Sequence, residues 1–347
     1  MAIRIGLVGY GDGGRLFHAP YIQASEACEL AGVVVRNAER ARQAAEDLPG
    51  VPVFASLGEL IDAGVDAVTT STPPDTRRAL VREAIGRGVG GLADKPFGPS
   101  AEAAQELVDA ANAAGVVLNV FHNRRYDTDV VTAREVIAGG LLGDLTRLDL
   151  RFDLDEPWTL EPGPAGGLLR DLGSHVVDQA LSLMGPAVSV SAHLDHIDLP
   201  AGRTNSGFVI TIAHDGGGHS HVSASKINRL VSKELRVHGT HGSYVSDFTD
   251  VQTAAIKRGE RPVGRRADWG VEDEARWGTL AVQGSEPTRV PSARGDYSVL
   301  YDEFAAAVEA GGPGPVPGEE GVAVLRVLDA ALLSAADGRT VGLRSAD

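Results

Sequence analysis

Short apolar runs alternate with longer amphipathic stretches along the first third of the chain. The apolar runs, which predict buried strands, span residues 3–9, 30–35, 53–55, 67–71, 90–93 and 116–121. The stretches between them predict helices over 14–24, 38–47, 76–87 and 101–114. Such alternation is typical of βαβ units, whose parallel strands are buried on both faces and are therefore apolar throughout. We expect an α/β fold with a Rossmann-like doubly wound parallel sheet, in a domain that spans residues 1–121.

The pattern changes after about residue 145. Residues 145–154 alternate between apolar and polar with period two, which indicates a strand with one solvent-facing side. Further strands are expected over 188–194, 208–213, 219–225, 233–238 and 243–248, and two helices over 297–310 and 318–336. Residues 257–296 are polar and predict loops. We therefore predict an α+β domain over 122–347 with a large, mostly antiparallel open sheet, whose last helices pack back on the first domain.

Composition excludes several classes of protein. The chain has 32 Lys and Arg against 47 Asp and Glu, a net charge of −15, which argues against nucleic acid or an anionic membrane as its main partner. Its one cysteine, Cys28, rules out an intrachain disulfide and a Cys-based zinc site. No run of about 18 apolar residues and no signal-peptide pattern is present, so we expect a soluble cytoplasmic protein.

A glycine-rich turn follows the first predicted strand and opens the first predicted helix. Its sequence, Gly9-Tyr10-Gly11-Asp12-Gly13-Gly14, fits G-x-G-x-x-G. In this context the glycines allow a tight turn, close approach of a pyrophosphate and close packing of helix on strand. A glycine-rich turn that binds no ligand would have the same sequence pattern. The placement of this turn between a strand and a helix nevertheless favours a dinucleotide site made by Gly9, Gly11, Asp12, Gly13 and Gly14.

The end of the second predicted strand indicates which dinucleotide binds. An acidic residue about twenty positions past the turn would accept the ribose 2′-hydroxyl of NAD. Val35 lies near that place and Arg36 follows it. Valine accepts no hydrogen bond, whereas arginine pairs bidentately with the 2′-phosphate of NADP. The sequence therefore favours NADP over NAD, unless Arg36 is only a solvated side chain.

Four ordered segments carry a family resemblance. They are the glycine turn continuing to Phe17-His18-Ala19-Pro20, then Thr72-Pro73, then Asp94-Lys95-Pro96-Phe97, and then Gly166–Gln179. Residues 121–127 and 237–243 add support. With these segments the chain resembles the Gfo/Idh/MocA oxidoreductase family, and its Phe-His-Ala-Pro and Phe-His-Asn-Arg-Arg forms are most similar to the NADP-dependent scyllo-inositol dehydrogenase-like subgroup.

The resemblance implies a catalytic set of Lys95, Asp171 and His175. It also implies that Thr72, Pro73 and Lys95 contact the cofactor, and that the protein is a homodimer or homotetramer. Two positions depart from the family pattern, which often has Asn after Thr-Pro and His a few residues later. Pro74 and Arg77 stand there in this chain and put some cofactor and substrate contacts in doubt.

The residues themselves agree with this set. Asp171 and His175 are four apart, so in a helix they share one face, and an imidazole serves as general acid or base near neutral pH. Lys95 follows a predicted parallel strand, at the edge where open α/β sheets bind ligands, and its ammonium would stabilise a developing alkoxide. By spacing alone, an ordinary loop lysine and a surface Asp–His pair remain alternatives.

Other polar residues are candidates for substrate contact. We expect Arg124, Tyr126, Trp158 and Gln179 to contact substrate, although at least one of Arg124 and Arg125 has a structural role on the simpler interpretation. Asp178 and Gln179 serve equally well to support the helix, and rim packing also explains Trp158. Several histidines lie close together in the sequence, at 214, 219, 221, 238 and 241, but no spacing completes a known site and we expect no metal.

These observations predict an NAD(P)-dependent oxidoreductase. It would transfer a hydride between nicotinamide and a carbinol or ketone carbon of a cyclic polyol, sugar or sugar derivative. Two alternatives stay open, a nucleotide-sugar ketoreductase of secondary metabolism and a catalytically silent NAD(P)-binding regulator. The expected partners are a small polyol or sugar and further copies of the chain, with no nucleic acid and no membrane.

Overall fold

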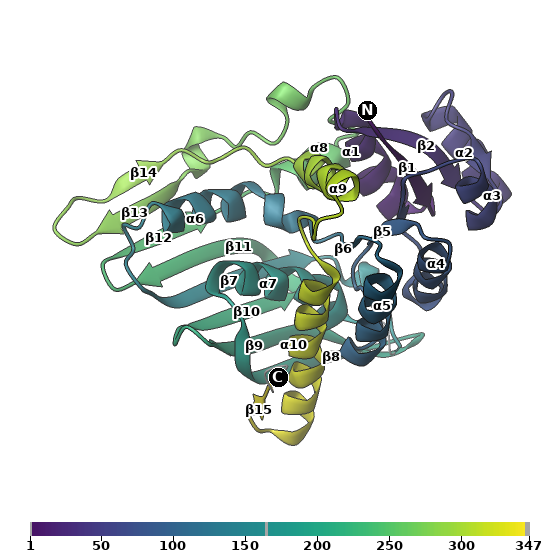
Figure 1. The fold of residues 1–347 in the computed structure, drawn as a ribbon. Coiled ribbons are helices and arrows are strands. Elements are labelled where there is room, and N and C mark those ends of the chain that lie inside the picture. The colour runs from purple at the N-terminus through teal and green to yellow at the C-terminus, as the bar shows by residue number, and fades with distance from the viewer. Residues whose placement is uncertain (1, 164–165, 344–347) are drawn as a thin grey trace. The chain divides into compact units, whose positions relative to one another are not determined.

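The computed structural model describes residues 2–163 and 166–343, and its elements are labelled in Figure 1. The chain forms two compact units, each built from three separate segments. Unit 1 consists of Met1–Asn123, Ala255–Trp269 and Asp296–Val322. Unit 2 consists of Arg124–Ala254, Gly270–Gly295 and Ala323–Asp347.

Unit 1 contains a six-stranded parallel sheet of order β3-β2-β1-β4-β5-β6. Its strands are β1 (Ile3–Val8), β2 (Cys28–Val34), β3 (Val53–Phe54), β4 (Ala67–Thr70), β5 (Gly90–Ala93) and β6 (Leu118–Val120). The strand order reverses between β1 and β4, and open α/β sheets bind ligands at the carboxyl ends of the strands beside such a switch. The predicted doubly wound parallel sheet is confirmed.

Helices cover this sheet. They are the π-helical turn Gly13–His18, α1 (Ala19–Ala24), α2 (Ala38–Asp47), α3 (Leu57–Asp62), α4 (Pro74–Gly86), α5 (Ala101–Ala114) and α9 (Ser298–Ala310). Side-chain caps start two of them at the predicted residue, because Asn37 accepts from the backbone N–H groups of Glu39 and Arg40, and Ser100 accepts from that of Ala103. Helix α9 comes from far down the chain and packs on α1, β1 and β2.

Unit 2 is built on a nine-stranded sheet of order β14-β13-β12-β11-β7-β10-β9-β8-β15. Its strands are β7 (Leu145–Asp155), β8 (Ala187–Leu199), β9 (Gly202–His214), β10 (His219–Ser225), β11 (Ile227–Gly239), β12 (Gly242–Asp247), β13 (Gly278–Val282), β14 (Thr288–Val290) and β15 (Val341–Gly342). Neighbouring strands are antiparallel except β7 and β10, which are parallel. The sheet is therefore mixed and mostly antiparallel.

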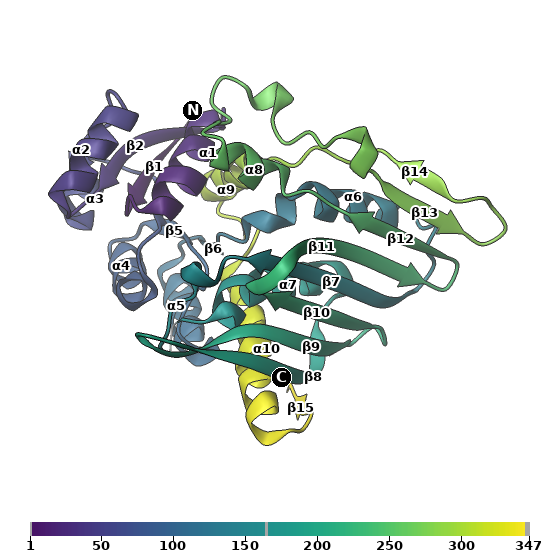
Figure 2. The same ribbon diagram turned by 180° about the vertical axis from the view of Figure 1, so that it is seen from behind.

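One face of the nine-stranded sheet packs against helices. Helix α7 (Leu168–Met184) lies on β7, β9 and β10, and α6 (Thr128–Ala138) lies on β11 and β12 (Figure 1). On β7, Leu148, Leu150 and Phe152 are buried while Arg147 and Arg151 are exposed, as the period-two pattern predicts. Figure 2 shows the sheet from its opposite face.

The remaining elements are helical. They are α8 (Val251–Lys257), α10 (Gly318–Asp337) and the 3₁₀ turns Asn123–Tyr126, Pro157–Thr159, Arg266–Asp268 and Glu274–Arg276. The prediction of loops throughout 257–296 was wrong for β13 and β14, which are short strands at one end of the sheet order. In the described part of the chain no helix is both long and apolar enough to cross a membrane.

Candidate active site

The glycine-rich turn closes tightly at two of its glycines and stays open at a third. Gly9 has φ +105°, and an added Cβ would lie 2.3 Å from the Ser71 carbonyl oxygen. A Cβ on Gly14 would lie 2.1 Å from the Gly9 carbonyl oxygen, so helix and strand meet there. The atom nearest to a Cβ on Gly11 is Arg40 Nη1, at 3.7 Å. The free space over Gly11, beside a helix N-terminus, fits the pyrophosphate of a dinucleotide.

The other two predicted turn residues begin the helix. Asp12 is exposed and already helical, and Gly13 faces the loops that follow β4 and β5. A Cβ on Gly13 would lie 2.6 Å from Ser71 Oγ and 3.3 Å from Asp94 Oδ2. The third glycine of the run is therefore required by the neighbouring loops rather than by the turn itself.

The end of β2 presents arginines and no carboxylate. Val35 is buried, whereas Arg36 is exposed immediately after it. Arg40 stands one helical turn further on in α2 and extends over Gly11. The sequence analysis missed Arg40, although its spacing of four from Arg36 at the start of a helix was a usable signal.

The sheet brings the Thr72–Pro73 and Asp94–Lys95 loops to the same edge as the glycine turn, because β1, β4 and β5 are adjacent and parallel. Asp94 Oδ2 accepts a hydrogen bond from Ser71 Oγ at 3.0 Å and faces His18 Nε2 at 3.4 Å. Burial would raise the pKa of the Asp94 carboxyl, but the adjacent His18 imidazole and the charges of Arg77 and Lys95 hold that pKa below its usual range. Asp94 is therefore ionised beside the predicted catalytic lysine.

The structure explains the two departures from the family pattern. Pro74 is the first residue of α4, where a missing N–H costs nothing. Arg77 is only 4% exposed and donates to two backbone carbonyls, from Nη1 to Pro96 at 2.5 Å and from Nη2 to Thr72 at 2.6 Å. Its guanidinium thus joins the loop after β4 to the loop after β5.

In unit 2, Asp171, His175 and Gln179 lie along α7 at intervals of four and therefore share one helix face. His175 and Gln179 are buried, and Asp171 is partly exposed. Lys226 Nζ, between β10 and β11, donates to Asp171 Oδ2 at 2.7 Å. Sequence reasoning missed Lys226. Lysine is rare in this chain, which has four lysines, at 95, 226, 233 and 257, and 28 arginines. The presence of a lysine at 226 was therefore a usable signal.

Two predicted substrate residues are engaged in polar contacts near the start of unit 2. Arg124 donates to Asp127 at 3.0 Å and to Asp250 at 2.8 Å, and its guanidinium lies over the Phe152 ring at 4.9 Å. Gln179 Nε2 donates to the Arg124 carbonyl at 3.2 Å. These contacts favour a supporting role for Arg124 and Gln179.

The neighbouring residues differ in exposure. Arg125 forms a bidentate ion pair with Asp178, in which both side chains are almost fully buried. Tyr126 is buried, whereas Trp158 is 76% exposed on the Pro157–Thr159 turn. Substrate contact by Tyr126 and Trp158 stays a prediction.

The histidines of the nine-stranded sheet form no metal site in the described chain. The rings of His219 and His221 are 5.0 Å apart in an edge-to-face arrangement, and His238 Nε2 is 3.6 Å from Asp149 Oδ2. Within residues 2–163 and 166–343, no group of three or more His, Cys, Asp or Glu side chains is arranged to hold an ion.

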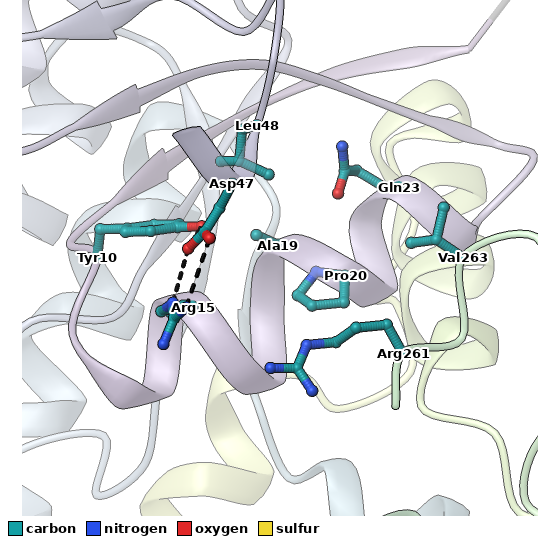
Figure 3. Close-up of a pocket in the computed structure, with 9 residues that line it drawn as sticks. All are labelled: Tyr10, Arg15, Ala19, Pro20, Gln23, Asp47, Leu48, Arg261 and Val263. Atoms are coloured by element: carbon teal, nitrogen blue, oxygen red, sulfur yellow. Dashed lines mark hydrogen bonds and ion pairs between the residues drawn. The ribbon is translucent and has the colours of Figure 1, made fainter. Parts of the chain in front are cut away.

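A pocket of about 330 Å³ opens beside the glycine turn in unit 1 (Figure 3). Its lining residues are Tyr10, Arg15, Ala19, Pro20, Gln23, Asp47, Leu48, Arg261 and Val263. Asp47 accepts from Tyr10 Oη at 3.2 Å and from Arg15 Nε at 2.6 Å. Burial and the Asp47 carboxylate raise the pKa of the Tyr10 phenol, so it remains a hydrogen-bond donor. These contacts join Tyr10 and Arg15 to Asp47, the last residue of α2, and no predicted catalytic residue lines the pocket.

A parallel sheet with a glycine cradle at its switch point, followed in the chain by an open mixed sheet, defines a class of NAD(P)-binding oxidoreductases. Residues 3–122 match a family model described as an oxidoreductase family, NAD-binding Rossmann fold. Residues 134–343 match the model of the C-terminal alpha/beta domain of that family. The chain therefore belongs to the Gfo/Idh/MocA oxidoreductase family.

Individual relatives extend over nearly the whole chain. It is 32% identical over 342 residues to the uncharacterized oxidoreductase YdgJ of Escherichia coli, covering 96% of each chain. It is 29% identical over 350 residues to IolW of Bacillus subtilis, a scyllo-inositol 2-dehydrogenase (NADP(+)), covering 98% of this chain and 96% of that one. A solved putative oxidoreductase from Klebsiella pneumoniae, 32% identical, superposes with a TM-score of 0.88 over 100% of this chain and 96% of its own.

Proposed function

We propose that this protein is an NADP-preferring dehydrogenase or reductase that acts on a CH–OH carbon of a cyclic polyol, sugar or sugar derivative. One observation carries the proposal. The open space over Gly11 and the loop that bears Lys95 lie at the same edge of the parallel sheet. The relative IolW, named as an NADP-dependent scyllo-inositol 2-dehydrogenase, supports the substrate class. The buried free thiol of Cys28 is consistent with a cytoplasmic setting.

The cofactor would be held by groups of unit 1. The glycine turn would take the pyrophosphate, Arg36 and Arg40 the 2′-phosphate, and the Thr72–Pro73 and Lys95 loops the nicotinamide half. When bound, the nicotinamide gives or accepts the hydride. The two arginines and the lack of a carboxylate at the end of β2 support NADP over NAD.

The protein would supply charge and move one proton. In oxidation, the imidazole of His175 would accept the hydroxyl proton as the carbinol carbon becomes a ketone carbon. The Lys95 ammonium stabilises the negative charge that develops on the oxygen. Asp171, held by Lys226, orients the imidazole or binds a substrate hydroxyl.

A panel of free polyols, aldoses and nucleotide-linked sugars, each with NADP⁺ and NAD⁺ and followed at the nicotinamide absorbance, tests this proposal. We expect turnover of a free polyol or sugar with NADP⁺. We also expect kcat to fall by roughly 10²–10⁴ in Lys95→Met and His175→Ala, the usual loss when a general acid–base or charge-stabilising group is removed.

Lys257→Met, at an exposed lysine that ends α8, is the matched control and should keep wild-type kcat. Turnover of nucleotide-linked sugars alone would favour the alternative function, a nucleotide-sugar ketoreductase. Tight dinucleotide binding with no turnover, unchanged by the Lys95 and His175 variants, would point to the regulator.

A further inference from the structure

Both chain neighbours of Lys95 are held by side chains of unit 1. On one side, the Asp94 carboxylate accepts a hydrogen bond from Ser71 and faces the buried imidazole of His18. On the other side, the Pro96 carbonyl accepts a hydrogen bond from Arg77 Nη1. The backbone that carries Lys95 is therefore fixed from two directions.

Arg77 is an unusual choice for a buried position on α4. Burial lowers the pKa of its guanidinium, which shows that the environment disfavours the charge, and the negative Asp94 offsets this only in part. Within the described residues, Arg77 has no carboxylate within ion-pair distance, and both its printed hydrogen bonds go to loop carbonyls. An apolar side chain would pack there without desolvating a charge. A planar guanidinium, however, can donate to two carbonyls at once, and in this way Arg77 links Thr72 to Pro96.

His18 makes the second support. Its ring is fully buried and lies 4.0 Å from the Phe121 ring, between centroids. Nδ1 is 2.7 Å from Tyr301 Oη, on α9, and Nε2 faces Asp94. A Tyr301 hydroxyl that donates to Nδ1 leaves the ring N–H on Nε2, where it faces the carboxylate. A residue 283 positions further along the chain thus fixes the orientation of the group behind Asp94.

We propose that Arg77 and His18 are positioning residues, which act through the Thr72–Pro73 and Asp94–Lys95–Pro96 loops and touch no reacting atom. This inference rests on the proposed function, because the two loops are the ones assigned to the nicotinamide half of the cofactor. It adds to that function two residues, Arg77 and His18, that should affect the affinity for NADPH and the affinity for NADH by the same factor.

The test measures dinucleotide affinity and needs no substrate. The dissociation constants of NADPH and NADH are determined by nicotinamide fluorescence for wild type, Arg77→Gln, Arg77→Lys and His18→Gln. Arg78→Gln is the matched control, because Arg78 is the next residue of α4 and pairs on the surface with Glu106. Circular dichroism and thermal melts establish the folded fraction of each variant.

For Arg77→Gln we expect about a ten-fold weaker affinity, by the same factor for NADPH and NADH. Arg77→Lys should recover part of the loss, because an ammonium reaches only one of the two carbonyls at a time. We expect a three- to five-fold loss for His18→Gln, which decides the matter if Arg77→Gln does not fold, and less than two-fold for Arg78→Gln.

Three results would overturn the inference. In the first, folded Arg77→Gln and His18→Gln bind both dinucleotides within two-fold of wild type, as residues important only for stability would. In the second, the loss in Arg77→Gln is confined to NADPH, so that Arg77 reads the phosphate. In the third, the wild-type protein binds neither dinucleotide, which overturns the proposed function as well.

Discussion

At the scale of single residues, the proposed cofactor preference rests on Arg36 after β2 and on Arg40 in the first turn of α2. Arg36 is exposed and Arg40 extends over Gly11, while Val35 offers the ribose no acceptor. A guanidinium forms a bidentate ion pair with a 2′-phosphate but not with a 2′-hydroxyl, and hydrogen bonds to charged groups contribute about 1.5–3 kcal/mol. The discrimination between the two dinucleotides should therefore lie in these side chains.

We predict that Arg36→Ala weakens NADP binding by roughly ten-fold or more and changes NAD binding by less than three-fold, because about 1.4 kcal/mol corresponds to a factor of ten. Titration of both dinucleotides by calorimetry measures this difference. Arg40→Ala should act in the same direction, and the exposed Arg42→Ala in the same helix is the control. Equal losses for NADP and NAD would show that Arg36 does not read the phosphate.

At the scale of elements, the glycine turn separates into a packing position and a binding position. The Cβ of an alanine at 14 would collide with the Gly9 carbonyl oxygen, at 2.1 Å, and force helix and strand apart. The Cβ of an alanine at 11 would meet nothing nearer than 3.7 Å, but would occupy the space proposed for the pyrophosphate. Within this motif, Gly14 is therefore required for packing of helix on strand, and Gly11 for binding of the pyrophosphate.

We predict that Gly14→Ala lowers the melting temperature by several degrees, since overpacking costs about 1–3 kcal/mol. Gly11→Ala should melt within about 1 °C of wild type and bind NADPH at least ten-fold more weakly, because a methyl group blocks the approach of the phosphate. Thermal melts with and without NADPH separate the two effects. Unchanged NADPH affinity in Gly11→Ala would contradict a pyrophosphate at this turn.

At the scale of the whole molecule, we propose self-association on the face of the nine-stranded sheet opposite α6 and α7. Residues His193, Val209, Ser223, Arg151 and Glu234 form a cross-strand row over five strands of this face. Val209 is 51% exposed within the row, with charges of both signs to one side of it. A two-fold interface pairs the same patch of both copies, so a charge of one copy can face the opposite charge of the other.

We predict a dimer of about 72 kDa, twice the chain mass of 36.1 kDa, in light scattering at micromolar concentration. Val209→Glu should shift the protein to monomer, because the interface would bury an unpaired charge. Leu333→Glu, at a comparably exposed position on α10, should not. Added salt should strengthen the dimer by screening two chains of net charge −15. A wild-type monomer, or a dimer indifferent to Val209→Glu, would contradict this surface.

Much of the fold was predictable because local patterns and tertiary packing agree. The helix limits 38–47 and 101–114 were predicted from the pattern of the residues within them, and the structure has the same limits. Helix α3 was missed because six residues carry less than two turns of periodicity, and β14 because three largely exposed residues have no apolar alternation. Element types are fixed locally only where an element is long enough to show its period.

The candidate site divides in the same way. The sequence alone determined the glycine turn, Arg36 after β2, Lys95 after β5 and the shared face of Asp171 and His175, because each depends on spacing within one strand–turn–helix unit or one helix. Tertiary structure alone decided the contacts that support them, namely Arg77 between two loops, Tyr301 behind His18 and Lys226 on Asp171. The physical reason is that a polar side chain is assigned to a buried partner by the whole packed unit, and that partner can lie hundreds of residues away.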